Sequence, residues 1–297
     1  MQAHAQTDID GLMMEKRQLC IAAMAGTTTF TQYWEGTLKR NNLNLGTVRA
    51  NNFSLMANYG VTNNLNIMAS LPYIKTKATA GQLAGQQGLQ DASIFIKYLA
   101  KRTKLKGGIL DAILVAGASA PSSNYTPDIM PLSLGLGCKN AIGRFILDYQ
   151  KKHIFATLSG SYMQRSNVKL DRNTYYTTQI NYTNIVNMPN ACNINFRAGY
   201  RSQSLVAEAF IDQVNTLGGF DITRNNIPFC SNKMNFTKLG IHIKYETNFV
   251  PGLALVLDAN TTLAGRNYGK STSINAGVYY IINILKKAAK STAHDTQ

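Results

Sequence analysis

Apolar and polar residues alternate along most of this chain, and residues 193–213 show the pattern clearly. In the first half of this stretch, Phe196 would lie on an apolar face of a strand and Arg197 on the opposite, polar face. After a polar turn, Ile211 and Asp212 divide in the same way. Because successive side chains point to opposite faces of a strand, one face must meet an apolar phase and the other a polar one. The recurrence of this pattern is typical of a transmembrane β-barrel.

Twelve alternating segments can be drawn, which predicts an all-β fold: a single antiparallel up-and-down transmembrane β-barrel. The segments lie at residues 18–34, 47–60, 65–78, 91–101, 109–119, 141–150, 153–166, 191–201, 204–214, 236–246, 252–265 and 271–283. The connections between them alternate in length. The short ones are 61–64, 102–108, 151–152, 202–203 and 248–252; the long ones are 36–46, 79–90, 121–140, 167–190 and 217–235, and the last outer connection, 266–270, is short.

This sorting of the connections predicts the orientation of the barrel. Outer-membrane barrels have short periplasmic turns and long extracellular loops. An even number of strands therefore puts both termini on the periplasmic side. A soluble all-β binding protein is a weaker alternative, because a soluble sandwich has no reason to sort its loops in this way.

The apolar faces of the clearest segments hold no charged residue, whereas the opposite faces do. We predict that these opposite faces line the lumen, with Lys97, Arg144, Asp148, Arg197, Glu208, Asp212, Lys238, His242, Lys244 and Asp258 as the lining residues. Lys or Arg on the lipid face near the midplane would cost about 2–4 kcal/mol, so the absence of charge there is expected. Two interpretations stay open: a selectivity lining for a polar or anionic solute, or a salt-bridge network that closes the lumen.

Tyrosines repeatedly end the apolar faces, and most of them lie near a short turn. They are Tyr59, Tyr73, Tyr98, Tyr149, Tyr200, Tyr245 and Tyr280. A tyrosine ring sits well among lipid headgroups with its hydroxyl in water, so we predict an aromatic girdle at the periplasmic interface.

Composition and charge narrow the class of protein. The chain has 297 residues, a hydrophobic content of 45% and a mean hydropathy of −0.14. No apolar run approaches the roughly 18 residues of a spanning helix, which excludes a helical membrane bundle. The net charge is +15, but the basic residues are dispersed over turns and the tail. We therefore expect contacts with outer-membrane lipid and lipopolysaccharide rather than with nucleic acid.

Candidate reactive residues are few. The four cysteines are too few for a disulfide scaffold, although Cys192 and Cys230 fall near the ends of neighbouring long loops and could pair. Four histidines and no CxxC spacing predict no metal site, and we expect no cofactor. No Ser–His spacing and no glycine-rich phosphate loop stands out, so we predict no catalytic residue and no enzymatic activity.

The chain is expected to divide into three parts. Residues 1–17 would be a signal-peptide remnant and a periplasmic segment, residues 18–283 the β-barrel, and residues 284–297 a polar periplasmic tail. Ala3-His4-Ala5 has the small-x-small form of a signal-peptidase site, with Gln6 as the first mature residue.

Two stretches, Tyr59–Ile74 and Gly88–Leu99, carry a family resemblance. A strand ends in Tyr-Gly, a turn holds Thr-Asn, the next strand reaches Leu-Pro-Tyr, and a Gly- and Asp-bearing loop enters a strand ending Lys-Tyr. The residues that carry this pattern are Tyr59, Gly60, Thr62, Leu71, Pro72, Tyr73, Asp91, Lys97 and Tyr98. The pattern resembles the outer-membrane β-barrels of the meta-pathway phenol-degradation family, which are related in architecture to fatty-acid and aromatic-hydrocarbon transporters.

The resemblance implies the outer membrane of a Gram-negative bacterium and uptake of small solutes, with aromatic or hydrophobic molecules among the candidates. It also implies that residues 7–18, which include Met13 and Met14, could plug the lumen; we favour a disordered periplasmic end instead. The alternative function is a closed-lumen barrel that is structural or binds an envelope partner through its extracellular loops. Loop 167–190, with Tyr175, Tyr176 and Tyr182, would then be the working surface. The sequence does not identify the solute, the oligomeric state or a partner.

Overall fold

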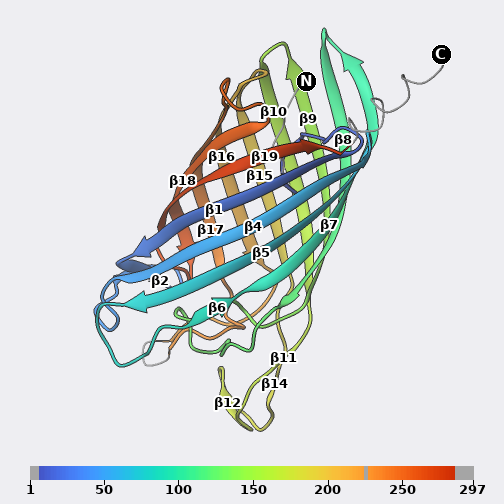
Figure 1. The fold of residues 1–297 in the computed structure, drawn as a ribbon. Helices are drawn as coiled ribbons and strands as arrows, with labels where there is room; N and C mark the ends of the chain where they lie inside the picture. Colours follow the sequence, from blue (N-terminus) through green and yellow to red (C-terminus); the bar gives the residue numbers. More distant parts are fainter. Residues whose placement is uncertain (1–6, 224–226, 285–297) are drawn as a thin grey trace, which may run out of the picture.

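The computed structural model describes residues 7–223 and 227–284, and twelve long strands among them form a closed antiparallel barrel (Figure 1). These strands are β1 (Gln18–Phe30), β4 (Val48–Thr62), β5 (Leu65–Ala78), β7 (Asp91–Leu105), β8 (Gly108–Pro121), β9 (Asn140–Lys151), β10 (Ile154–Arg165), β15 (Ala191–Arg201), β16 (Leu205–Thr216), β17 (Asn235–Glu246), β18 (Leu253–Arg266) and β19 (Thr272–Asn283). The barrel closes because β1 pairs with β4 on one side and with β19 on the other. The predicted fold class and all twelve predicted strands are confirmed.

Seven shorter strands lie in the long connections. β2 (Gln32–Glu35) pairs with β3 (Leu38–Asn41), β11 (Val168–Lys169) with β14 (Ile185–Val186), β12 (Tyr175–Tyr176) with β13 (Ile180–Asn181), and β6 (Gln87–Leu89) adds to β5. The described residues contain no helix that is long and apolar enough to cross a membrane.

The two ends of the barrel differ in the length of their connections, as predicted. At the end we call the short-turn end, β1 begins, β19 ends, and successive strands are joined by tight turns (Figure 1). Lys106 (φ 47°) and Gly107 (φ 78°) make one such turn between β7 and β8. Positive φ at both central residues matches the twist of a hairpin. The other end, which we call the loop end, carries the long connections.

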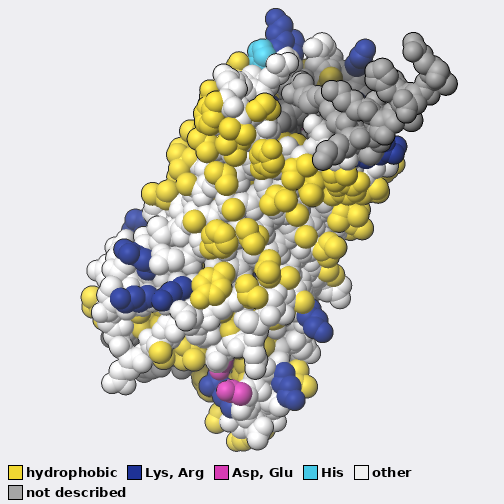
Figure 2. Space-filling view, viewed as in Figure 1, with side chains coloured by type: hydrophobic (Ala, Val, Ile, Leu, Met, Phe, Trp, Pro, Cys, Tyr) yellow, Lys and Arg dark blue, Asp and Glu magenta, His cyan; other side chains and the backbone are white. Residues whose placement is uncertain are grey.

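The predicted lipid-facing residues point away from the barrel axis. Phe196 and Ile241 are 46% and 47% exposed, while Arg197 and Lys244, on the inward faces of the same two strands, are 7% and 2% exposed. On the face seen in Figure 2, apolar side chains cover the middle of the barrel wall, and most Lys and Arg side chains lie toward its two ends. This distribution is the one that a lipid bilayer requires, because uncharged surface must face the hydrocarbon.

The outward tyrosines lie where predicted, with one correction. Five of the seven fall in the part of their strand near the short-turn end; for example, Tyr200 is opposite Ile154, the first residue of β10. Tyr98 is at the middle of the longer β7 but is opposite Leu65, the first residue of β5. Tyr73 was wrongly grouped with them, because it is opposite Leu89 of β6 at the loop end. Its strand runs from a short turn toward a long loop, so Tyr73 follows the turn by many residues.

Cys192 and Cys230 do not pair, and the structure has both as free thiols. Cys192 lies on the outward side of β15 opposite Tyr162, which is itself 50% exposed. Cys230 is buried in a loop and packs with Cys138 among apolar side chains. The prediction was wrong because both residues are near loop ends in the sequence, but the barrel wall separates their side chains.

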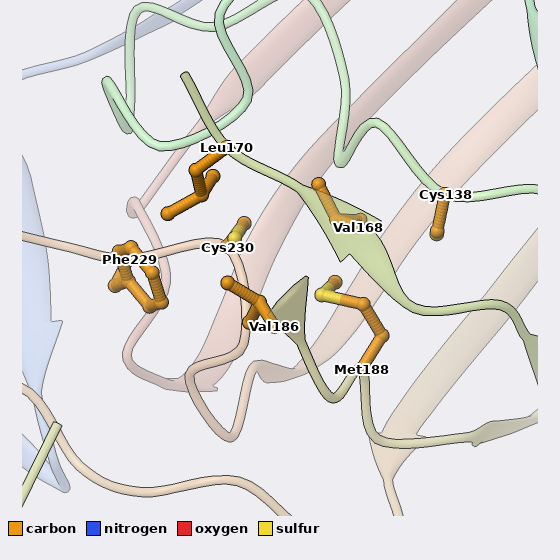
Figure 3. Packing of buried hydrophobic residues seen from close by; sticks show 7 residues of the cluster. All are labelled: Cys138, Val168, Leu170, Val186, Met188, Phe229 and Cys230. Atoms are coloured by element: carbon orange, nitrogen blue, oxygen red, sulfur yellow. The ribbon is translucent and has the colours of Figure 1, made fainter. Parts of the chain in front are cut away.

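The long loops share a small hydrophobic core of their own, which we call the cap cluster (Figure 3). It joins the loops at 122–139, 166–190 and 217–234, and consists of Cys138, Val168, Leu170, Val186, Met188, Phe229 and Cys230. The ring of Phe229 stacks on that of Tyr175, with centroids 5.5 Å apart. Burial of these side chains gives the loops a defined arrangement at the loop end.

A second contact ties loop 217–234 to the last connection, 267–271. Arg266 donates two hydrogen bonds to Asp221, at 2.8 and 2.6 Å. The Arg266 guanidinium holds the pKa of the Asp221 carboxyl at about 2, and the Asn267 amide contributes to the lowering. Asn267 Oδ1 in turn accepts from the backbone N–H groups of Gly36 and Ile222. Three connections are thereby fixed around one asparagine.

Candidate functional site: the barrel lumen

All ten charged residues predicted to line the lumen lie on the inner face of the barrel wall. Each is buried or half-buried, and each alternates with an outward apolar neighbour: Lys97, Arg144, Asp148, Arg197, Glu208, Asp212, Lys238, His242, Lys244 and Asp258. The register follows from the strand pairing, in which Asp212 is opposite Lys238 and Glu208 opposite His242. These groups and the N-terminal segment form the candidate site.

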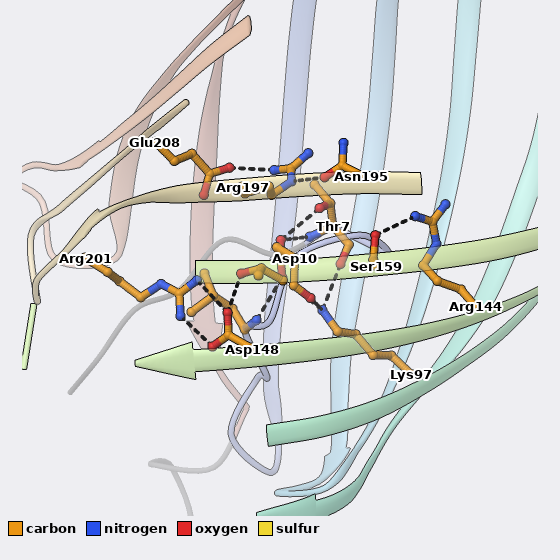
Figure 4. A network of polar contacts seen from close by, with 12 residues as sticks. Thr7, Asp10, Lys97, Arg144, Asp148, Ser159, Asn195, Arg197, Arg201 and Glu208 are labelled. Atoms are coloured by element: carbon orange, nitrogen blue, oxygen red, sulfur yellow. Dashed lines mark hydrogen bonds and ion pairs between the residues drawn. The ribbon is translucent and has the colours of Figure 1, made fainter. Parts of the chain in front are cut away.

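In the N-terminal segment, residues 7–14 lie inside the lumen and residues 15–17 are exposed at its short-turn end, so the expectation of a disordered periplasmic end was wrong. The segment leaves β1 at the short-turn end, where the Arg17 N–H donates to Gly60 O at 2.7 Å. Lys97, whose side chain is fully buried, donates to Thr7 O at 2.9 Å, Asp10 O at 2.7 Å and Asp10 Oδ1 at 2.9 Å (Figure 4). An ammonium group has three donors, and all three are used here. Residues 1–6, which hold the predicted cleavage site, and the predicted tail beyond residue 284 lie outside the described residues.

Further contacts hold the segment against several strands. Asp8 forms an ion pair of 3.3 Å with Arg144 of β9. Gly11 lies so close to β9 that a Cβ there would be 2.0 Å from Cγ of Asp148, so only glycine fits. Met13 and Met14 pack in two separate apolar clusters near the short-turn end. The segment is therefore anchored by both charge and apolar burial.

Asp148 is the centre of another group of contacts (Figure 4). Arg201 of β15 forms a 3.0 Å ion pair with it, and Thr157 of β10 donates a hydrogen bond to it. The Arg201 guanidinium also lies over the ring of Phe155, 3.8 Å from the centroid. The carboxylate of Asp148 and the Phe155 ring together balance the charge of this buried guanidinium, as a buried cation requires.

A third group lies on β15 and β16. Arg197 forms a 2.5 Å ion pair with Glu208 and donates from Nε to Asn195 Oδ1 at 2.8 Å. Asn195 in turn donates to Asp212 at 2.9 Å, and so does Asn193 at 2.8 Å. Arg197 and Glu208 therefore bind each other, which satisfies two of the charges that the sequence left without a partner.

The remaining predicted residues are less tightly engaged. His242 Nδ1 is 3.7 Å from Asp258 Oδ2. Lys238 lies nearer the loop end, with Nζ 4.7 Å from the ring centroid of Phe236. A cavity of about 270 Å³ remains beside the N-terminal segment, and its charged lining residues are Asp10, Arg197, Glu208, His242, Lys244 and Asp258. The ion pairs therefore narrow the lumen without filling it.

Sequence reasoning missed Asp8, Asp10 and Arg201. The signal for the two aspartates was available: the predicted lumen residues include five basic and four acidic side chains, and Thr7–Met14 carries two acidic residues and no basic one. An acidic segment complements a basic lumen. Arg201 could also have been identified, because it lies four residues after Arg197 in β15 and alternation puts both on the inward face.

Within the described residues no group of three or more His, Cys, Asp or Glu side chains could hold a metal ion. The lumen offers hydrogen-bond donors, acceptors and both signs of charge. This chemistry suits contact with a polar solute, water or a counter-charge.

Comparison with known proteins gives a fold but no family. No family model matches the chain, and no curated protein matches it. An outer membrane channel from Pseudomonas putida F1 superimposes with a TM-score of 0.72 at 13% identity, over 93% of this chain and 100% of that one.

Two other solved barrels align less well. The porin NanC gives a TM-score of 0.47 at 10% identity, over 88% of this chain and 98% of that one. The translocator domain of the autotransporter NalP from Neisseria meningitidis gives 0.44 at 11% identity, over 89% of this chain and 87% of that one. The first match shows that this chain has the fold of an outer-membrane β-barrel. The resemblance to the phenol-degradation family stays a prediction.

Proposed function

We propose that this chain is an outer-membrane channel that passes small polar solutes through a lumen narrowed by its own N-terminal segment. The uncharged outer band and the closed barrel fit a bilayer. The superposition on a bacterial outer membrane channel supports the same conclusion. The solute is not assigned, and we keep aromatic and hydrophobic molecules as candidates only from the family resemblance.

The observation that carries the proposal is the luminal cavity of about 270 Å³ beside the N-terminal segment. It is lined by charges of both signs, and His242 and Asp258 are partly accessible within it, with side chains 18% and 23% exposed. A lumen built only for stability would bring these groups into closer contact. Polar groups spaced around a cavity instead allow a solute to bind and leave, which conduction requires.

The N-terminal segment sets the width of this path. Its anchors, the Lys97–Asp10 and Arg144–Asp8 ion pairs, hold it to β7 and β9, the two strands that pair with β8. Removing the stretch would leave the barrel wall closed, because β1 begins only at Gln18. The width of the channel can therefore be changed without changing the barrel.

Planar-bilayer recording of the full chain tests the proposal directly. We expect a small single-channel current from the full chain and a larger one from a variant lacking residues 7–14. Tyr182→Ala, in a side chain that is 83% exposed in loop 166–190, serves as a control with unchanged current. If neither the full chain nor the shortened variant carries current or passes solute into liposomes, the channel proposal fails and the closed-lumen alternative replaces it.

We place the protein in the outer membrane of a Gram-negative bacterium, in contact with anionic lipid headgroups. The basic turn residues Lys101, Lys104, Lys106, Lys151 and Lys152 are exposed at the short-turn end and suit such contacts. Heat-modifiable migration in detergent gels tests the membrane barrel. A chain that stays soluble without detergent and shows no folded-barrel band would contradict it.

A further inference from the structure

A second and larger cavity lies at the loop end, and nothing in the luminal site accounts for it. It has a volume of about 450 Å³ and is bordered by the end of β1, by four of the long connections (31–47, 79–90, 122–139 and 217–234) and by the short last connection, 267–271. Its walls include the side chains of Phe30, Tyr33, Leu45, Leu83, Met130 and Tyr268. This volume is in the range of small-molecule sites in proteins. We call it the mouth cavity.

The lining of the mouth cavity is uncharged, in contrast to the lumen. Among the described residues that line it there is no Asp, Glu, Lys, Arg or His. An ionised ligand would lose its hydration here without a counter-charge. A ligand of this cavity is therefore neutral and mostly apolar.

Three of the polar side chains that line the cavity, Thr28, Asn267 and Ser271, already have hydrogen-bond partners. Thr28 is bonded to Ser273 at 2.8 Å and Ser271 to Thr262 at 3.0 Å. The amide of Asn267 is engaged on both its nitrogen and its oxygen. These groups hold the walls in place and are not free to bind a ligand.

Among the buried polar side chains that line the cavity, which are Asn42, Asn267 and Ser271, Asn42 is the one whose amide nitrogen has no partner. It is 9% exposed and lines the cavity, yet its side-chain Nδ2 makes no hydrogen bond. Its position is fixed by its backbone, because its N–H donates to Thr31 O at 2.9 Å and its C=O accepts from Gly46 N at 2.7 Å. A buried amide donor without a partner is unusual, and it is available to donate a hydrogen bond to an acceptor in the cavity.

We propose that the mouth cavity binds a neutral, largely apolar small molecule that carries one acceptor oxygen, and that Asn42 Nδ2 donates to this oxygen. The apolar walls bury the body of the ligand, and the single amide fixes its orientation. This binding site is independent of conduction through the lumen, so it can be tested without any current.

Benzophenone is a suitable probe, because it is neutral, has one carbonyl acceptor and forms covalent bonds to nearby C–H groups when irradiated. The folded full chain is irradiated in lipid nanodiscs over a range of benzophenone concentrations, and the labelled peptides are identified by mass spectrometry. We expect saturable labelling of peptides that contain Phe30, Leu45 or Met130. Labelling of lipid-facing strands should rise with concentration without saturating.

Substitutions of Asn42 test the hydrogen bond. Loss of one hydrogen bond should raise the benzophenone concentration that gives half-maximal labelling about five-fold in Asn42→Ala. Asn42→Asp keeps the shape of the side chain but presents only acceptors. It should raise the half-saturating benzophenone concentration by more than Asn42→Ala does. Asn44→Ala, an amide that lines the same cavity but is exposed, is the matched control and should change little. Heat-modifiable migration shows that each variant is folded.

A second probe separates the hydrogen bond from apolar packing. Diphenylmethane has a similar apolar body and no acceptor, so it should compete for the site equally well in the parent chain and in Asn42→Ala. The proposal is overturned if no loop-end peptide is labelled saturably. It is also overturned if Asn42→Ala and Asn42→Asp bind benzophenone like the parent, or if diphenylmethane competition falls in parallel with benzophenone binding.

Discussion

The two ends of the barrel interior are built on different principles. Toward the short-turn end, the N-terminal segment occupies part of the lumen, and buried charges such as Lys97 and Asp148 are held in ion pairs. At the loop end, a cavity of about 450 Å³ stays open, its described lining is uncharged, and the Asn42 amide nitrogen is unpaired. The luminal cavity is thus lined by charges of both signs, and the mouth cavity by uncharged side chains.

The difference shows that the inner wall and the loops are held in place by different interactions. In the wall, strand pairing fixes the position of every inward side chain, so ion pairs can be built across neighbouring strands. At the loop end, no sheet imposes a register, and the loops are ordered by the cap cluster and by the Asp221–Arg266 contact. Ion pairs thus connect strands inside the regular wall, whereas an apolar cluster and an ion pair together hold the irregular loops.

Breaking the pair between Asp10 and Lys97 should have the largest effect. Asp10→Ala leaves a fully buried ammonium without its counter-charge, which costs about 3–5 kcal/mol when a buried pair is broken. We expect a lower free energy of unfolding in urea, measured on the folded barrel in detergent.

A double variant makes this prediction decisive. Asp10→Leu combined with Lys97→Met removes both charges, and should recover most of the stability that the single change loses. Asp171→Ala, which removes an exposed carboxylate, is the control. Additive losses in the double variant would mean that the two groups do not interact as the structure shows.

The cap cluster should respond locally rather than globally. Phe229→Ala removes a ring that is 6% exposed, and such a truncation costs about 3–5 kcal/mol of packing. We expect faster tryptic cleavage in loop 166–190 with unchanged heat-modifiable migration of the barrel. Ile227→Ala, in a side chain that is 55% exposed, should leave the cleavage rate unchanged. Loss of the folded-barrel band in Phe229→Ala would show that cap and wall form one cooperative unit.

The two faces of a single strand should differ in their tolerance of charge. Ile241→Arg places a cation on the lipid face of β17, at a cost of about 2–4 kcal/mol near the midplane, and should block assembly. Lys244→Ala, on the inner face of the same strand, should assemble because its side chain borders the luminal cavity. Assembly is measured as the folded fraction after refolding into lipid vesicles. Equal tolerance of the two changes would contradict the observed register.

The smallest effect is expected at the Asp221–Arg266 contact, where both side chains are partly exposed. Because folding lowers the pKa of Asp221 from 3.8 to about 2, its contribution is complete above pH 4. The contribution is lost as the pH falls through about 2. A carbon NMR titration of the Asp221 carboxyl should show this midpoint, and Arg266→Gln should move it upward. A midpoint near 4 in the parent chain would show that the contact does not form in solution.

The direction of side chains in the barrel wall could be predicted well, because it depends only on consecutive residues in the sequence. Phe196 and Arg197 take opposite faces for a reason that any two consecutive strand residues share. The inward positions of all ten predicted charges followed from this alternation. Their partners did not: Arg144 binds Asp8, which lies outside any strand, and alternation puts Arg201 in the lumen without showing that it binds Asp148.

The interior beyond the wall could not be predicted in the same way. Residues 7–14 have no alternation, so their place in the lumen depends on complementarity with groups far away in the sequence, such as Lys97. The pairing of Cys192 with Cys230 was wrong because nearness to loop ends carries no information about which side of the wall a side chain takes. The Asn42 amide gave no sequence signal at all, since only the folded loops bury it.

The attachment of the N-terminal segment at Arg17 limits how far the segment can travel once its ion pairs break. Asp10 lies seven positions before Arg17, and at about 3.3–3.6 Å per residue this tether reaches about 25 Å when fully extended. β4 has 15 residues and spans about 50 Å at about 3.3 Å per residue, so a released Asp10 cannot reach the loop end. A tether this short keeps Asp10 at an effective concentration in the millimolar range around Lys97. Rebinding is therefore intramolecular and fast, and even a weak contact returns the segment to its place.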